Sequence, residues 1–111
     1  MFKHNQYLLS DIIKYVKDTQ FADDDFCLYG KYGASLNLTD LYLVSDYPEV
    51  INDKDVYPQD VTEESFGLVY YGEHFIDVIS SALEQKESAS ENELLEALIF
   101  FYKHDNFISF K

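Results

Sequence analysis

The chain has 111 residues, which is the length of one domain, and we expect residues 1–111 to form a single unit. It contains 21 acidic residues against 8 lysines and no arginine, for a net charge of −13 and a pI near 4.3. This charge excludes a protein that holds nucleic acid phosphates or anionic lipid directly, and it favours a neutral or basic partner.

The first predicted element is an amphipathic helix over about residues 6–18. Its apolar positions recur at helical spacing and are separated by charged residues: Leu8, Leu9, Ile12, Ile13 and Val16. The preceding residues contain no apolar stretch typical of a secretion signal. The longest apolar run, residues 97–102, is far shorter than the roughly 20 residues of a membrane span. We therefore expect a soluble cytoplasmic protein.

The middle of the chain predicts short strands followed by a long acidic loop. Residues 26–29 indicate a strand that stops at Gly30, and residues 36–44 indicate one or two more. Residues 46–64 contain seven acids, one lysine and both prolines. We interpret them as a loop with at most a short turn of helix, a kind of segment that is usually functional or disordered.

The last third predicts one strand, over residues 66–71, and two helices. The helices cover about residues 73–86 and 91–104, and the second begins at a capping box formed by Ser90 and Glu93. A final apolar stretch, residues 107–110, could add an edge strand. The order α-β-β-β-α-α predicts an α+β fold, with an antiparallel sheet of three or four strands packed by three helices.

The negative charge is concentrated in residues 23–64, which carry −9 against +1 before them and −5 after them. Several tyrosines lie within the same stretch, and tyrosine is enriched where proteins bind one another. We predict a protein-binding surface there. Its candidate residues are Asp23, Asp24, Asp25, Tyr29, Tyr32, Asp46, Tyr47, Glu49, Asp53, Asp55, Tyr57 and Asp60.

We predict no catalytic, cofactor-binding or metal-binding residues. The single cysteine, Cys27, lies in an apolar run, and its acidic neighbours would raise the pKa of its thiol rather than activate it. The three histidines are far apart in sequence, and neither acidic cluster has the spacing of a calcium loop. Phosphate-binding and nucleophile motifs are absent from the sequence.

The C-terminal third resembles small bacterial immunity proteins. The resemblance is carried by Ser90-x-x-Glu93-Leu94-Leu95-x-Ala97-Leu98 and Tyr102-x-x-Asp105-x-Phe107-Ile108, within residues 68–108. Proteins of this kind are encoded beside toxins of contact-dependent growth inhibition systems. The resemblance implies an inhibitor without enzymatic activity that binds the C-terminal nuclease domain of a large exoprotein. It implies no functional residues, because the matched positions are typical of core and helix-capping sites.

The charge supports the same hypothesis independently, because a nuclease that holds phosphate has a basic cleft and an acidic protein would be steered towards it. We expect a monomer or weak dimer that occludes the toxin, and we expect charge reversal at Asp53 and Asp55 to slow association. The alternative is an acidic mimic of nucleic acid that inhibits a DNA-processing enzyme. A small enzyme or metal sensor is a third hypothesis, but it would need a cluster of ligands or catalytic groups.

Overall fold

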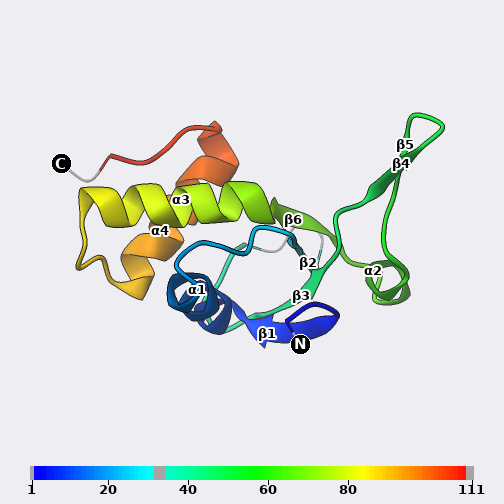
Figure 1. The fold of residues 1–111 in the computed structure, drawn as a ribbon, viewed down its shortest axis with the longest axis horizontal. Coiled ribbons are helices and arrows are strands. Elements are labelled where there is room, and N and C mark those ends of the chain that lie inside the picture. Colours follow the sequence, from blue (N-terminus) through cyan, green and yellow to red (C-terminus); the bar gives the residue numbers. More distant parts are fainter. Residues whose placement is uncertain (1, 32–34, 110–111) are drawn as a thin grey trace.

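The fold is known from a computed structural model, which describes residues 2–31 and 35–109. Its main sheet has four antiparallel strands in the order β1-β3-β2-β6: β1 (Asn5–Leu8), β3 (Leu41–Ser45), β2 (Cys27–Gly30) and β6 (Gly67–Tyr71). A separate hairpin is formed by β4 (Glu49–Ile51) and β5 (Lys54–Val56). The helices are α1 (Leu9–Asp18), α2 (Gln59–Glu63), α3 (Gly72–Gln85) and α4 (Glu91–His104). The predicted α+β class is confirmed (Figure 1).

The three long helices cover one face of the main sheet. Successive strand residues point to opposite faces, and the strands contribute Leu28, Tyr42, Val44 and Tyr70 to this side. These residues pack with the apolar stripes of α1, α3 and α4 in one large core. Tyr70 is buried in it and donates its hydroxyl to the carbonyl oxygen of Leu98, 2.6 Å away.

The other face of the sheet carries a second, smaller core. Cys27, Tyr29 and Leu43 point to this side and pack with Val61 of α2. Half-buried aromatic residues complete the cluster, among them Tyr47 and Tyr57, which flank the hairpin in sequence. Residues 46–64, which we call the acidic segment, therefore pack on the second face of the sheet through Tyr47, Tyr57 and Val61.

The N-terminal prediction is wrong in part, because residues 5–8 form a strand and the helix begins only at Leu9. The prediction began too early because Leu8 fits the apolar spacing of α1. In the structure, residues 5–8 pair with β3 instead, from Asn5 opposite Val44 to Leu8 opposite Leu41. At the other end, Phe107–Ser109 form no strand. Within the described residues, no helix is long and apolar enough to span a membrane.

The predicted capping box at α4 is confirmed. The Ser90 hydroxyl accepts a hydrogen bond from the backbone N–H of Glu93 at 3.2 Å, and the Glu93 carboxylate accepts one from the N–H of Ser90 at 3.0 Å. Lys86 adds an ion pair to Glu93. Together these contacts explain why this helix begins where the sequence indicates.

Replacing the capping serine should weaken the fold measurably. We expect Ser90→Ala to lower the free energy of unfolding by about 1 kcal/mol, because an N–H group of the first turn loses its acceptor. Urea unfolding followed by circular dichroism measures the change. Ser88→Ala, at an exposed serine just before the cap, is the matched control and should leave the midpoint unchanged.

Candidate functional site

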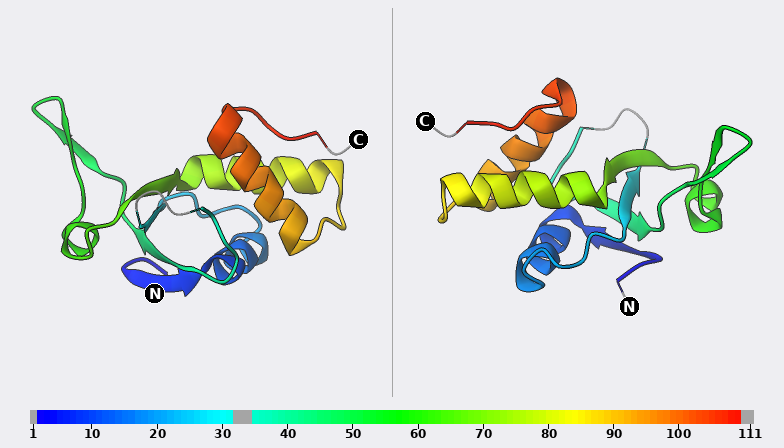
Figure 2. Two further views of the ribbon diagram at one scale, coloured as in Figure 1. Left: turned by 180° about the vertical axis from the view of Figure 1, so that it is seen from behind. Right: turned by 45° about the horizontal axis from the view of Figure 1, so that its top comes forward.

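The most exposed part of the acidic segment is the hairpin of residues 49–56, which we call the arm. It projects from one end of the body, away from α1, α3 and α4, with α2 near its base (Figures 1 and 2). Asn52 and Asp53 form its turn, with φ of 53° and 63°. Two consecutive left-handed residues are the signature of the type I′ turn, whose twist matches that of a two-stranded ribbon.

The register of the arm decides which side chains share a face. Glu49 lies opposite Val56, Val50 opposite Asp55, and Ile51 opposite Lys54. Because opposed residues point the same way and successive residues alternate, each face combines apolar and charged groups. One face carries Glu49, Ile51, Lys54 and Val56, and the other carries Val50 and Asp55.

The apolar residues of the arm face solvent. Val50 is 71% exposed, Ile51 is 48% exposed and Val56 is 44% exposed. Within the described residues, β4 and β5 pair only with each other, so both outer edges of the ribbon keep unpaired backbone groups. Exposed branched side chains beside open strand edges are typical of a surface that another chain covers.

The base of the arm is held rigidly by the smaller core. The Tyr29 hydroxyl donates to the carbonyl oxygen of Asp46 at 2.7 Å, just before β4. After β5, the ring of Tyr57 packs edge-on against Tyr29, with 6.1 Å between ring centroids. Val61 of α2 is fully buried beneath both. The arm therefore extends from a fixed platform.

An ion network strengthens the same base from the N-terminal side. The Lys3 amine lies 2.8 Å from a carboxylate oxygen of Asp46 and 3.0 Å from one of Asp25. The hydrogen bonds that Lys3 donates to Asp46 and Asp25 raise the pKa of its amine. This lysine thus compensates two of the acids that the sequence predicted to contact a partner.

A second group of polar contacts surrounds Asp60 in α2. Its carboxylate accepts the Ser45 hydroxyl at 2.8 Å and lies 2.9 Å from Nδ1 of His4. Burial opposes ionisation of Asp60, but the hydrogen bonds from His4 and Ser45 outweigh it and lower the pKa of the carboxyl below its ordinary value of 3.8. Asp60 therefore fastens α2 to β3.

The lowered pKa of Asp60 predicts a pH dependence of stability. Because the pKa of Asp60 is lower in the folded chain than its ordinary value of 3.8, the ionised carboxylate stabilises the fold above pH 3.8. This stabilisation is lost as the pH falls through the folded-state pKa. We expect Asp60→Asn to lower the unfolding free energy by about 1 kcal/mol at pH 7 and to differ less from the original chain at pH 2. Urea unfolding at both pH values measures the difference. Asp55→Asn on the exposed arm is the control and should follow the original chain throughout.

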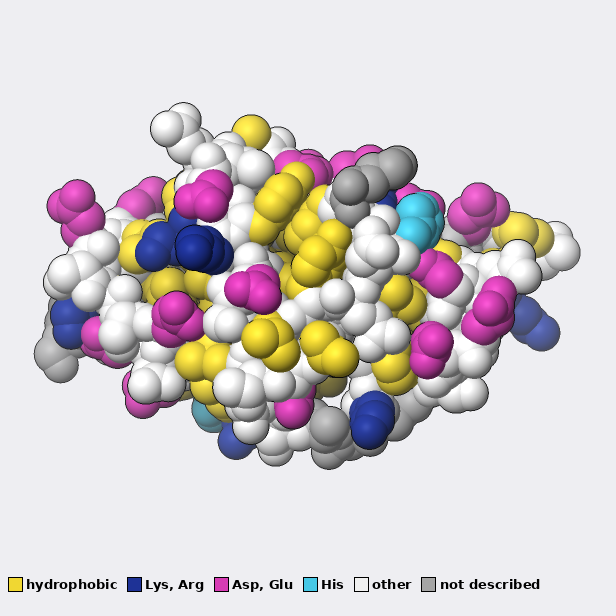
Figure 3. Space-filling view, turned by 90° about the horizontal axis from the view of Figure 1, so that it is seen from below, with side chains coloured by type: hydrophobic (Ala, Val, Ile, Leu, Met, Phe, Trp, Pro, Cys, Tyr) yellow, Lys and Arg dark blue, Asp and Glu magenta, His cyan; other side chains and the backbone are white. Residues whose placement is uncertain are grey.

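The structure divides the predicted surface into two sets of residues. Glu49, Asp53 and Asp55 on the arm are exposed, as is Asp24, beside the base. Asp23, Asp25, Asp46 and Asp60 make hydrogen bonds or ion pairs within the chain. Tyr32 lies outside the described residues. Seen from the side of α1 and β1, acidic side chains surround a central group of hydrophobic ones and reach the end that carries the arm (Figure 3).

Three of the predicted tyrosines support the arm from below. Tyr29 is fully buried and cannot act as the exposed anchor that the sequence suggested. Tyr57 is half-buried against it. The hydroxyl of Tyr47, also half-buried, donates to the carbonyl oxygen of Asp24 and accepts the N–H of Glu73, both at 3.1 Å.

Cys27 is buried beside Tyr29, as the sequence predicted. Burial raises the pKa of its thiol to about 11, with a smaller contribution from the charge of Asp25, so the thiolate is disfavoured. Within the described residues, no three His, Cys, Asp or Glu side chains are grouped so that they could hold a metal ion.

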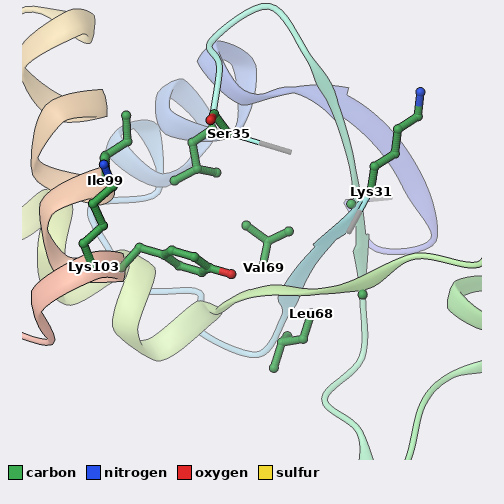
Figure 4. Close-up of a pocket in the computed structure, with 10 residues that line it drawn as sticks. Lys31, Ser35, Leu68, Val69, Ile99 and Lys103 are labelled. Atoms are coloured by element: carbon green, nitrogen blue, oxygen red, sulfur yellow. The ribbon is translucent and has the colours of Figure 1, made fainter. Parts of the chain in front are cut away.

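Two hollows lie along β6. One, of about 400 Å³, is lined by Leu68, Val69, Ile99, Lys31 and Lys103, among others. Figure 4 shows the Lys31 and Lys103 side chains extending away from one another on opposite sides of it, so their charges do not converge on one ligand. The other hollow, of about 340 Å³, is lined mainly by aromatic side chains and by Asp105.

Sequence reasoning missed the hairpin, although a signal was present. The stretch Val50-Ile51-Asn52-Asp53-Lys54-Asp55-Val56 places two residues that tolerate positive φ between β-branched flanks. The usual signal is Asn-Gly or Asp-Gly, and strands of three residues are shorter than the pattern normally requires. The predicted loop is therefore wrong in part: residues 49–56 fold as a hairpin, whereas α2 is the short turn of helix that the sequence allowed.

Comparison with known proteins places the chain in a family without adding a function. No curated protein and no solved structure matches it. Residues 6–110 match the family model described as a domain of unknown function, DUF7716, and this match spans nearly the whole chain. The protein therefore belongs to the DUF7716 family.

Proposed function

We propose that this protein is an immunity protein that binds a basic toxin domain and neutralises it without chemistry of its own. The observation that carries the proposal is the arm: an exposed acidic hairpin with apolar side chains, held on a rigid base. The toxin would be the C-terminal nuclease domain of a contact-dependent growth inhibition exoprotein. The protein would act in the cytoplasm, where the toxin reaches its substrate.

The dimensions of the arm suit insertion into a cleft. Two paired strands lie about 5 Å apart, and each residue advances the ribbon by about 3.4 Å. The arm therefore offers a narrow, extended shape with Asp53 at its tip and Glu49 and Asp55 along its sides. A nuclease cleft that binds phosphate is lined with positive charge, so its field attracts this tip during encounter.

The rigid base favours tight binding. A segment that orders only on binding loses conformational entropy at that moment, whereas a preorganised one does not. The hydrogen bond from Tyr29 to Asp46 and the packing of Tyr57 and Val61 fix both ends of the arm in advance. α2 and the neighbouring loop would extend the contact towards the roughly 1,600 Å² of a standard interface.

The exposed apolar residues of the arm favour a protein contact over mimicry of nucleic acid. A mimic needs acids spaced along a surface like phosphates, but the arm interrupts its acids with Val50, Ile51 and Lys54. Apolar side chains of this kind gain free energy when another protein covers them. Inhibition of several unrelated DNA-binding enzymes would instead support the mimic.

Co-expression with the adjacent gene product tests the proposal. The C-terminal fragment encoded by the neighbouring upstream frame should arrest growth when expressed alone, and this protein should relieve the arrest and co-purify with the fragment. A nuclease fragment inactivated in its active site is the control and should bind without toxicity. Arrest that persists during co-expression, or a fragment that is harmless when active, would contradict the proposal.

A further inference from the structure

The aromatic hollow at the junction of β6, α3 and α4 is distinct from the arm. Its lining includes Tyr71 and His74 at the start of α3, and Phe101, Tyr102 and Asp105 at the end of α4. β6 runs directly into α3, and α4 packs against α3, which brings the end of α4 close to this junction. Tyr71, His74 and Tyr102 are exposed, so the rings are accessible from solvent.

The rings form a continuous aromatic wall. Tyr71 and His74 pack edge to face with 5.6 Å between centroids, and His74 lies 5.6 Å from Phe101. Tyr102 is 62% exposed and lies 6.1 Å from the buried ring of Tyr70 behind it. The faces of such rings carry partial negative charge and attract cations.

Among the described residues that line the hollow, one is a carboxylate, and its charge attracts a cation. Asp105 is one of its lining residues, and within the described residues its carboxylate makes no ion pair. It caps the C-terminus of α4 with φ of 52°, and its N–H donates to the carbonyl oxygen of Phe101 at 2.8 Å. The C-terminal end of a helix carries partial negative charge, which adds to that of the carboxylate.

Among the described residues, the lining of this hollow includes no lysine that would attract an anion. The neighbouring hollow differs, because Lys103 is among its lining residues and turns towards Ile99 (Figure 4). At the start of α3, the N–H of Gly72 is bonded to the carbonyl oxygen of Phe26 and that of Glu73 to the hydroxyl of Tyr47. The first donors of the helix are therefore already occupied.

We propose that this hollow binds the guanidinium group of an arginine side chain. A guanidinium is planar, stacks on aromatic rings and pairs with a carboxylate through two N–H groups, whereas a lysine ammonium can make neither planar contact. Tyr102 in the last turn of α4 and Asp105 at its C-cap both line the hollow and would supply the ring and the carboxylate. Tyr71 and His74 also line the hollow.

The position of the hollow beside the base of the arm suggests that the arginine belongs to the same partner that binds the arm. Tyr71 stacks on Tyr47 with 5.8 Å between centroids, and Tyr47 lies just before the arm. A basic partner that engages the arm could therefore reach the hollow across a continuous aromatic surface. This role in the partner complex rests on the proposed function, whereas the arginine site itself does not.

A titration with isolated side-chain analogues tests the site without any partner. N-acetyl-arginine methylamide is added to the ¹⁵N-labelled chain, and the amide shifts are followed by NMR. We expect saturable shifts at Tyr71, His74, Tyr102 and Asp105. The citrulline analogue, which has nearly the same shape without the charge, should bind at least about fivefold more weakly.

Two conservative variants make the result specific. Tyr102→Leu removes an exposed ring from a helix that tolerates leucine, and Asp105→Asn removes the charge at a position whose left-handed conformation asparagine accepts. Each should weaken arginine binding at least about threefold, while Glu87→Gln at the far end of α3 should not. Equal binding of arginine and citrulline, or shifts confined to other residues, would overturn the proposal.

The two proposals fail separately. If the analogue does not bind but the partner still co-purifies, the arginine site is wrong and the immunity function stands. If the analogue binds as expected but co-expression gives no relief of growth arrest, the site stands and the immunity function is wrong.

Discussion

Reversing the charge of Asp53 and Asp55 together should slow association with the proposed basic toxin domain by at least about tenfold at low ionic strength. Both side chains are exposed, one at the tip of the arm and one on its side. Their negative charges would be the first part of the protein to attract an approaching basic cleft. Stopped-flow association rates for Asp53→Lys/Asp55→Lys measure the effect. The difference should shrink as salt is raised, because the screening length falls from about 10 Å at 0.1 M to about 3 Å at 1 M.

Two companion variants separate charge from shape. Asp53→Asn/Asp55→Asn removes half as much charge and keeps the turn, because asparagine tolerates the φ of 63° at residue 53. It should change the logarithm of the association rate about half as much as the double reversal to lysine does. Glu84→Lys/Glu87→Lys makes the same charge reversal at the other end of a molecule 43 Å long and should change the rate much less. Equal slowing by the two reversals would show that only net charge matters.

We expect Gly72→Ala to lower the free energy of unfolding by about 3 kcal/mol, which is a large part of the 5–15 kcal/mol typical of a domain. Gly72 begins α3, and its N–H donates to the carbonyl oxygen of Phe26 at 2.7 Å. An added Cβ would overlap that oxygen and lie 2.9 Å from the carbonyl oxygen of Asp24. Both obstacles are backbone atoms, so the chain entering β2 must shift.

Thermal unfolding measures this effect, with an expected drop of roughly 10–20 °C in the midpoint. Gly30→Ala in the neighbouring strand is the matched control. There the added Cβ would lie 3.0 Å from a ring carbon of Tyr42, and a side chain can tilt where backbone cannot. We expect Gly30→Ala to lose about 1 kcal/mol. Equal losses in the two variants would show that the close approach at Gly72 is not the cause.

The helices were largely predictable because their signals are local. α4 begins and ends at the predicted residues, since Ser90 and Glu93 cap its start through side chains only three positions apart. α3 differs from its prediction by one residue at each end. Its apolar stripe meets the core at the spacing that the sequence shows.

Elements that depend on distant partners were harder to predict. β1 exists because Asn5–Leu8 pair with β3, which is far along the chain, and its own residues continue the pattern of α1. The hairpin has local pairing, but its Asn52–Asp53 turn lacks the glycine that usually marks one.

The composition of the candidate surface was predictable, whereas the role of each residue was not. The clustering of acids and tyrosines is visible in the sequence, but burial decides that Tyr29 supports the arm from below. Ion pairing with Lys3 compensates Asp25 and Asp46. The aromatic hollow brings together Tyr71, His74 and Asp105 from separate elements, so no local pattern could have indicated it.

A calorimetric titration of the toxin fragment into a chain with a shortened arm tests the central claim most directly. Deleting Val50, Ile51, Lys54 and Asp55 joins Glu49 and Val56 through the same Asn52–Asp53 turn. Two residues are removed from each strand, so the remaining side chains keep their faces, and the net charge is unchanged. The variant should unfold at nearly the original temperature, because the deleted residues are exposed. We predict one-to-one binding by the original chain and at least about a hundredfold weaker binding by the variant, as expected when central contacts are removed. Equal affinity of the two chains would contradict the claim that the arm is the binding element.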